Sequence, residues 1–408
     1  MKNILFLILL ISITLSAQKN AELPKVYTWD AKLLVDARQK ALSGDASISK
    51  TAANILKKAD KMLSESAVAV TDKSEYALRI SKADPHDYVS SSIYFWPDTT
   101  NENNPWKRID GKFNIEFQNK FDFPVRAEMI NRITYLTMAW WFTNKKEYAQ
   151  KAAEQLKVWF INKETFMNPN MERAQFVPND LKRGWGSCYG ILDAERFANV
   201  LNCVGMLKFS GEWSDKDNKA LQNWYVQFNK WLMESKNGKE ESIQLNNHGV
   251  SYDITLGTGL LFVNDTAAAR KLFTEAKTKR IDVQIDPDGS MPRELARAGS
   301  FHYTCVNLDA FTRLALVAEK ANVDLWNYQS ADNRSIKNAF RFTYPYLNGT
   351  KKWEFRESVE HKKMFDPFWQ ASSRIPEAKE VLKLNILPAL PNDYAKYNLL
   401  SALFPLSL

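Results

Sequence analysis

The residues of this chain best suited to chemistry are its histidines, because imidazole is the side chain that ordinarily titrates nearest neutral pH. The chain has only four histidines. Three of them lie beside polar or aromatic neighbours, in Pro85-His86-Asp87-Tyr88, in Asn246-Asn247-His248-Gly249 and in Phe301-His302-Tyr303, whereas His361 lies in a stretch with no other signal. Arg297, a residue type that clamps carboxylates, shortly precedes His302. The combination predicts proton transfer next to an anion.

Asn247 and His248 stand just before a helix that we expect to begin between 249 and 252. A helix N-terminus presents free N–H groups and positive potential, and Asn is a favoured capping residue there. Two interpretations remain open. Either the Asn caps the helix and His248 is a bystander, or Asn247 binds a substrate carboxylate and His248 acts as a base.

Arg297 and Tyr303 form a second candidate pair. Their spacing has no fixed meaning on a helix, but Gly299 lies between them and permits a turn that brings both side chains into one pocket. The alternative is a surface arginine followed by a core tyrosine.

Further candidates to bind a sugar come from two polar, aromatic segments. The loop from 80 to 125 contains Tyr88, Tyr94 and Trp96, and a loop this long is more often functional than decorative. The segment from 167 to 185 adds Gln175, Arg183 and Trp185, which suit hydrogen bonding and stacking. We add Arg293 and His302 to this substrate-binding set. The alternative is that the rings only fix the loops to the core.

Hydrophobic spacing along most of the chain is helical. Apolar residues recur at helical intervals over 47–63, 148–159, 192–207, 213–233, 267–281 and 308–321. Clusters of Gly, Asn and Asp separate these segments, and strand-like alternation is rare. The pattern predicts an all-α fold of many helices joined in sequence as hairpins.

The N-terminus resembles an export signal. Lys2 precedes an apolar run that is too short to span a membrane, and small residues follow at Ser16 and Ala17. We therefore expect a signal peptide at 1–17 and a mature protein, 18–408, that is periplasmic or secreted. No linker divides the mature chain, so we expect a single domain.

Charge and cysteine content narrow the class of partner. The net charge is +8, which favours polyanions, and without a nucleic-acid motif we favour acidic polysaccharide over nucleic acid. No later segment is apolar enough to cross a membrane. The three cysteines, Cys188, Cys203 and Cys305, have no metal-ligand spacing. Cys188 and Cys203 either pair or remain buried thiols.

The order of these motifs resembles the alginate lyase superfamily. The resemblance rests on His86-Asp-Tyr88, Tyr94-Phe-Trp96-Pro-Asp98, Trp159-Phe160, Met167-Asn-Pro-Asn170, Ala174-Gln175, Gly190-Ile-Leu-Asp193, Asn247-His248, Leu295-Ala-Arg297 and His302-Tyr303. It covers roughly residues 75–325 and is nearest to polysaccharide lyase families 5 and 38. The segment from Arg297 to Tyr303 is shorter than its family 5 counterpart, which favours family 38.

The resemblance implies an incomplete (α/α) toroid that cleaves acidic polysaccharide by β-elimination, with no metal and no organic cofactor. It implies catalytic roles for Asn247, His248, Arg297 and Tyr303. Arg297 and Asn247 would neutralise a uronate carboxylate, and Tyr303 and His248 would share the acid and base roles. A tyrosine base needs a lowered pKa, which we expect Arg297 to supply. The expected substrate is a 1,4-linked polyuronate, namely mannuronate-containing alginate.

Three alternatives remain open. The first is a glucuronan lyase of the same mechanism. The second is a glycoside hydrolase, which would draw two opposed carboxyls from Asp87, Asp193, Asp253 and Glu294, although nothing in the sequence pairs them. The third is a non-catalytic protein that binds acidic glycans. Sugar stereochemistry, endo or exo action and oligomeric state have no signal in the sequence.

Overall fold

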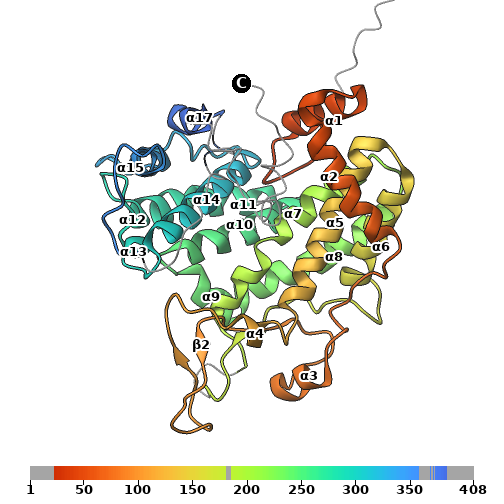
Figure 1. Cartoon of the computed structure of the whole chain (residues 1–408), viewed down its shortest axis with the longest axis horizontal. Coiled ribbons are helices and arrows are strands. Elements are labelled where there is room, and N and C mark those ends of the chain that lie inside the picture. The colour runs from red at the N-terminus through yellow and green to blue at the C-terminus, as the bar shows by residue number, and fades with distance from the viewer. Residues whose placement is uncertain (1–22, 181–184, 358–367, 369–370, 372, 384–408) are drawn as a thin grey trace, which may run out of the picture.

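A computed structural model describes residues 23–180, 185–357, 368, 371 and 373–383. The expected signal peptide at 1–17 therefore lies outside the described residues. Helices dominate the rest (Figure 1). None of the helices in the described ranges combines the length and the apolarity that a membrane crossing requires.

Four helices form an inner row. They are α5 (Phe123–Thr143), α7 (Phe197–Leu207), α10 (Asn247–Phe262) and α14 (Ser300–Glu319). Helix α5 packs on α7, α7 packs on α10, and α10 packs on α14. These helices are apolar on nearly every side, which is the composition of a helix enclosed by others. In α10, every residue except His248 is buried.

Outer helices cover this row and follow the inner ones as hairpins. They are α6 (Lys146–Phe160), α8 (Asp215–Glu234), α11 (Thr266–Ala276) and α15 (Ile336–Leu347). Helix α6 packs on α5, α8 and α11 pack on α10, and α15 packs on α14. Each buries one face, as an amphipathic helix does. The predicted all-α class and the incomplete α/α toroid are confirmed.

The remaining helices complete the helical part. The N-terminal ones are α1 (Ala31–Ser43), α2 (Ala46–Leu63), α3 (Glu75–Ser81) and α4 (Ile115–Gln118). The later ones are the 3-10 turn η1 (Cys188–Ala194), α9 (Lys236–Ser242), the π turn η2 (Lys277–Ile281), α12 (Asp282–Gln284), α13 (Pro292–Leu295) and α17 (Pro376–Lys383). Their ends follow local chemistry: Asp30 caps α1, and Gly44 ends it in the left-handed region at φ 74°.

Two small sheets lie at one end of the helical body. Strand β1 (Val89–Ser91) pairs in parallel with β4 (Arg173–Phe176). Strand β2 (Phe95–Trp96) pairs antiparallel with β3 (Lys107–Arg108), and this hairpin projects below α9 in Figure 1. A small apolar cluster of Ala77, Val89, Phe117, Phe121 and Phe176 packs there. The long loop predicted at 80–125 thus contains strands β1, β2 and β3 and the short helix α4.

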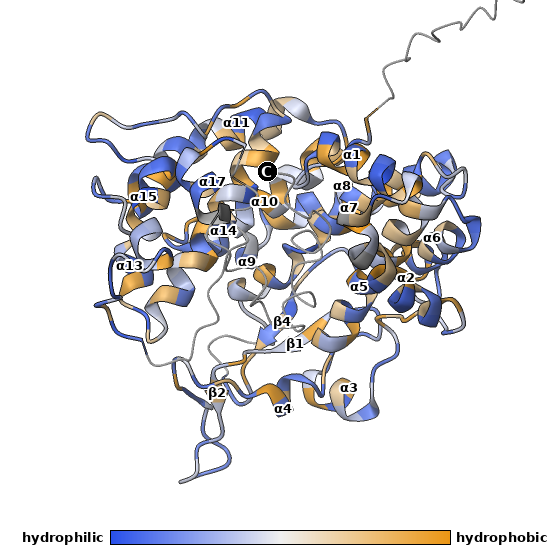
Figure 2. Ribbon diagram, turned by 45° about the horizontal axis from the view of Figure 1, so that its top comes forward, coloured by the Kyte–Doolittle hydropathy of each residue, from blue (hydrophilic) through white to orange (hydrophobic). Residues whose placement is uncertain are grey.

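The main hydrophobic core runs through the inner helices, and Figure 2 shows its apolar residues gathered in α10 at the centre. All three cysteines lie in the buried interior as free thiols, so the pairing of Cys188 with Cys203 is excluded. Burial raises the pKa of the Cys203 thiol to about 12, which keeps it protonated and unreactive.

Two predicted helices begin elsewhere in the structure. The segment 192–207 starts as the 3-10 turn η1, and α7 begins only at Phe197. The helix expected at 308–321 begins at Ser300. The sequence pattern missed its first turns because they carry the polar residues His302 and Tyr303 and so lack apolar periodicity. The earlier start places Tyr303 on a rigid helix instead of in a loop.

Candidate active site

The candidate site lies at the end of the molecule where the inner helices begin. Asn247 and His248 open α10, Tyr303 lies in the first turn of α14, and Asp193 shortly precedes α7. The N-termini of α10 and α14 therefore direct positive potential toward one region, although protein groups already accept from the N–H groups of Asn247, His248 and Phe301. Such an end suits a polyanionic ligand.

Arg297 and Tyr303 are brought together as the sequence predicted. The guanidinium carbon of Arg297 lies 3.6 Å from the centre of the Tyr303 ring. The Tyr303 hydroxyl forms a hydrogen bond with the hydroxyl of Tyr94, which comes from the loop just before β2. A cation, a phenol and a second phenol thus converge, and the interpretation of a surface arginine with an unrelated core tyrosine is wrong.

His248 is held by a buried carboxylate. Its Nδ1 lies 2.7 Å from Glu241 Oε1, and the Glu241 side chain is fully buried. An ionised carboxylate only accepts hydrogen bonds, so Nδ1 donates its proton and Nε2 is left with a lone pair. The ring also makes an edge contact with Tyr189 at 5.0 Å between centroids. This is the arrangement of an oriented general base.

Asn246, not Asn247, caps α10. The Asn246 side chain accepts a hydrogen bond from the backbone N–H of His248. Asn247 is buried, its backbone N–H donates to Glu294 Oε1 at 3.0 Å, and its side-chain oxygen makes no hydrogen bond within the described structure. Asn246 therefore takes the capping role, and carboxylate binding by Asn247 stays a prediction.

Glu294, on α13, ties the two candidate pairs into one site. Its carboxyl is buried, and burial raises its pKa, while the hydrogen bond from Asn247 and the charges of Arg297 and His248 lower it. The Glu294 backbone carbonyl also accepts from the backbone N–H of Arg297 at 3.1 Å, so Glu294 contacts both the segment of Arg297 and, through Asn247, the segment of His248. This shared neighbour places the arginine–tyrosine pair and the histidine in the same cluster.

Asp110, just after β3, forms an ion pair with the Arg297 guanidinium. Its carboxylate accepts from Arg297 Nη2 at 2.8 Å and from Nε at 3.2 Å, and it also accepts from the backbone N–H of Ala298. Burial alone would raise the pKa of Asp110, but the hydrogen bond and charge of Arg297 lower it below its usual value.

The pKa of Tyr303 differs from the expectation. We expected Arg297 to lower it, but it is raised well above the ordinary phenol value. Burial is the largest cause, and the charge of Tyr94 and its hydrogen bond add to it, so the opposing charge of Arg297 does not prevail. Tyr303 is therefore a protonated phenol, suited to give a proton rather than to remove one.

Tyr88 was predicted to bind substrate, and that prediction is wrong because its side chain is only 1% exposed. Its hydroxyl donates to Asp193 at 3.1 Å, and Ser90 donates to the same carboxylate oxygen at 2.6 Å. Gln175, half-buried, donates to the other Asp193 oxygen at 3.3 Å. Gly190 permits this network, because a Cβ there would lie 2.4 Å from Ala174 Cβ.

The remaining substrate-binding candidates lie on more open surface. Trp185 is 40% exposed and carries Lys82 over its ring at 5.1 Å, while Lys112 lies 4.5 Å from the centre of the half-buried Trp96 ring. Arg293 is exposed on α13, and the His302 ring makes an edge contact with Tyr303. Arg183 lies outside the described residues. All of these remain predictions of sugar contact.

The carboxyls proposed for a hydrolase are held by protein groups. Asp253 is buried against Arg280 at 2.8 Å, and Asp87 accepts from Asn168 at 2.9 Å. Asp193 and Glu294 have the partners described above. Among residues 23–180, 185–357 and the few described beyond them, no group of three or more His, Cys, Asp or Glu side chains is arranged to hold a metal ion.

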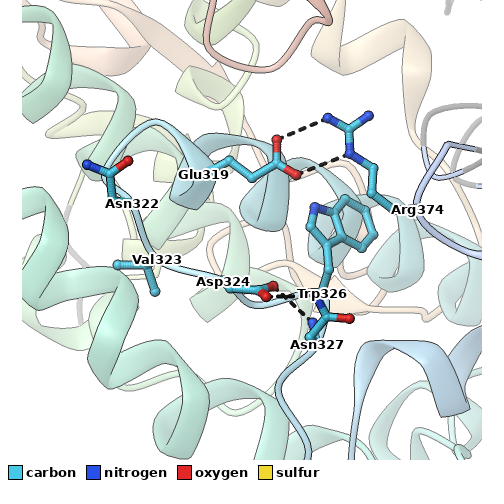
Figure 3. A pocket seen from close by; sticks show the side chains of 7 residues that line it. All are labelled: Glu319, Asn322, Val323, Asp324, Trp326, Asn327 and Arg374. Atoms are coloured by element: carbon cyan, nitrogen blue, oxygen red, sulfur yellow. Dashed lines mark hydrogen bonds and ion pairs between the residues drawn. The ribbon is translucent and has the colours of Figure 1, made fainter.

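A separate cavity of about 440 Å³ lies at the other end of α14 (Figure 3). Glu319 there pairs with Arg374, and Asp324 accepts from Asn327. Its charged groups satisfy one another. Tyr303 lies sixteen residues earlier on the helix, roughly 24 Å away at 1.5 Å per residue, so this cavity is not part of the candidate site.

Sequence reasoning missed the acidic residues that hold the site together, apart from Glu294, which it considered only for hydrolysis. Asp110 and Glu241 carried no local motif. The one available signal was the placement of Glu241 shortly before the Asn-Asn-His segment.

Comparison with known proteins identifies the family of the chain. The alginate lyase family model matches residues 70–353 of the chain. The crystal structure of an alginate lyase from Bacteroides ovatus is 29% identical, with 92% of this chain and 99% of that chain covered and a TM-score of 0.84. Alginate lyase A1-III from Sphingomonas species A1 is 15% identical, with 72% and 77% covered and a TM-score of 0.44. No curated protein matches the chain.

The α/α toroid and the cluster of Arg, Tyr, His and Asn at its end define a polysaccharide lyase. By its match over most of its length, the chain belongs to the alginate lyase family.

Proposed function

We propose that this enzyme cleaves a 1,4-linked polyuronate by β-elimination and that its substrate is mannuronate-containing alginate. The stacking of Arg297 on Tyr303, with His248 near the same buried carboxyl, is the observation that carries the proposal. The family and the alginate lyase from Bacteroides ovatus support the choice of alginate.

The carboxylate must be neutralised first. The C5 proton of a uronate is a poor acid while its carboxylate carries full charge, because the carbanion would lie beside an anion. Arg297 and the side-chain amide of Asn247 are placed to stabilise the enolate-like intermediate. The Asn247 side-chain nitrogen is the atom that would donate to the carboxylate, because the side-chain oxygen, which has no hydrogen-bond partner within the described structure, can only accept.

Proton transfer then divides between two residues. His248, oriented by Glu241, removes the C5 proton through Nε2. Tyr303, which its raised pKa keeps protonated, gives its proton to the leaving O4. The C4–O4 bond breaks, a C4–C5 double bond forms, and the shorter chain leaves with a hydroxyl. In mannuronate H5 and O4 lie on the same face of the ring, so His248 and Tyr303 must both act from that face; in guluronate the two atoms lie on opposite faces.

The charge of the protein favours encounter with an acidic polymer. The net charge of +8 and the helix N-termini favour long-range attraction of an acidic polymer. Export through a signal peptide at 1–17 would bring the enzyme to such a polymer. Activity should need no metal or organic cofactor, so prolonged chelation should leave the rate unchanged, and rescue by an added divalent ion would contradict this.

The test is a panel of polyuronates followed by ultraviolet absorbance of the C4–C5 double bond. We expect absorbance with mannuronate-rich alginate and a loss of about 10²–10⁴-fold in kcat for Tyr303→Phe and for His248→Ala, with folding verified by circular dichroism. New reducing ends without absorbance would identify a hydrolase. Binding with neither signal would identify a glycan-binding protein, and absorbance only with glucuronan would change the substrate.

A further inference from the structure

The hairpin from 94 to 112 makes two contacts with the catalytic pair, one from each of its ends. Tyr94 at its start bonds to the Tyr303 hydroxyl, and Asp110 near its end bonds to Arg297. The two ends are joined by the hydrogen bond from Ile109 N to Tyr94 O at 2.9 Å. The hairpin that contacts Tyr303 thus also carries Asp110, which lies against Arg297.

The Asp110 carboxylate makes the contacts that a sugar carboxylate would need. Two parallel N–H···O bonds to a guanidinium are the strongest geometry for binding a carboxylate. Asp110 makes them to Nε and Nη2 of Arg297, and the backbone N–H of Ala298 completes an anion pocket. The positive charge of Arg297, which the reaction requires to bind a substrate carboxylate, is thus already balanced by the carboxylate of Asp110.

We propose that Asp110 occupies the subsite of the substrate's carboxylate and must leave Arg297 before a uronate binds there. The proposal rests on the proposed function of Arg297. Asp110 then acts as a built-in competitor that sets the apparent affinity and rejects ligands unable to displace it, such as neutral sugars.

Displacement of Asp110 is physically accessible. Its side chain is 25% exposed, and the adjacent residues Lys107, Arg108 and Ile109 are exposed, so little apolar burial opposes its movement. Arg108 donates to the same carboxylate at 2.7 Å and can keep it paired when it turns away. Each uronate that binds has to overcome this local pairing, which raises KM by the inverse of the fraction of enzyme in which Asp110 is displaced.

The opposite role is that Asp110 positions Arg297 for catalysis. The two roles differ in kinetics. A competitor raises KM and leaves kcat unchanged, whereas a positioning residue supports the transition state and therefore kcat.

The test compares Asp110→Asn with Glu102→Gln. Glu102 is an exposed carboxylate on the same hairpin, so its variant makes the same change in net charge. We expect Asp110→Asn to lower KM for polymannuronate by about tenfold at unchanged kcat, and Glu102→Gln to leave both unchanged. An unchanged or raised KM, or a fall in kcat, would overturn the proposal.

Binding measured without turnover separates this proposal from the proposed function. In a Tyr303→Phe background, calorimetry with a saturated mannuronate oligosaccharide should show about tenfold tighter binding when Asp110→Asn is added. Unchanged or weaker binding would refute the competitor role even if the wild-type enzyme is an active lyase. If Asp110→Asn binds the oligosaccharide more tightly but the wild-type enzyme makes no unsaturated product, the competitor role stands and the proposed lyase activity is refuted.

Discussion

Glu241 and His248 are paired at the start of α10, with Glu241 Oε1 2.7 Å from His248 Nδ1 and the carboxyl fully buried. The carboxylate fixes which ring nitrogen carries the proton and stabilises the imidazolium that forms when the base takes a proton. His248 is also the one residue of α10 that is not buried, so its remaining nitrogen faces outward from the core. The pair is a carboxylate-oriented base built into the end of an inner helix.

Replacing Glu241 by Gln should lower kcat on the order of 10²-fold, because the imidazolium loses its negative partner. The temperature of thermal unfolding should change little, because the carboxamide has the size of the carboxyl it replaces. Glu240→Gln, an exposed neighbour, serves as the control. A loss of activity that comes with a matching loss of stability would mean that Glu241 only supports the fold.

The sequence predicted the candidate catalytic residues, but it did not predict the acidic residues that pair with them. Asn247, His248, Arg297 and Tyr303 stand in short motifs, and the structure clusters them. Asp110 is 187 residues from Arg297, and no local rule links such a pair. Glu241 precedes His248 by seven residues, but helix α9 ends at Ser242 and α10 begins only at Asn247, so helical spacing gives no signal.

The fold shows the same limit. Long helices were predicted wherever apolar residues recur at helical spacing, and their closure into an inner and an outer layer came from the resemblance. Strands β1 and β4 were missed, because they have three and four residues and pair across more than eighty residues of sequence. The start of α14 was missed because function places His302 and Tyr303 where a core helix would have apolar residues.

Tyr303 should keep its proton far into the alkaline range. Its pKa in the folded enzyme is raised above the ordinary value of 10.0, so the acid remains protonated at pH values where a free phenol has begun to ionise. The ratio kcat/KM should therefore show no alkaline limb from Tyr303 below about pH 10. An alkaline limb that begins near pH 8 and disappears in Tyr303→Phe would contradict this.

Tyr88→Phe should affect stability and not substrate binding. The hydroxyl is buried and donates to Asp193, so its loss should cost about 1 kcal/mol in the free energy of unfolding. KM should not change, because Asp193 keeps its bonds from Ser90 and Gln175. Denaturant unfolding and steady-state kinetics on the same preparation decide the matter, and a several-fold rise in KM would return Tyr88 to the substrate-binding set.

Arg280, in the π turn η2, holds the segment that leads into His248. Its guanidinium pairs with buried Asp253 at 2.8 and 2.9 Å and donates to the backbone carbonyls of Ser242 and Gln244 at 2.7 and 3.1 Å. Gly249 packs against the same guanidinium, since a Cβ there would lie 2.6 Å from Arg280 Nη1. The turn between α9 and α10 is thus defined by one buried cation.

Arg280→Met should therefore destabilise the protein by about 3–5 kcal/mol, because it leaves Asp253 buried without its partner. The double variant Arg280→Met with Asp253→Leu removes the buried charge as well and should recover most of that stability. It should not recover kcat, because the carbonyls of Ser242 and Gln244 still lack the donor that sets the direction of His248. Thermal unfolding and kcat of both variants, with exposed Lys279→Gln as the control, test this separation. Full recovery of both quantities in the double variant would show that Arg280 serves stability alone.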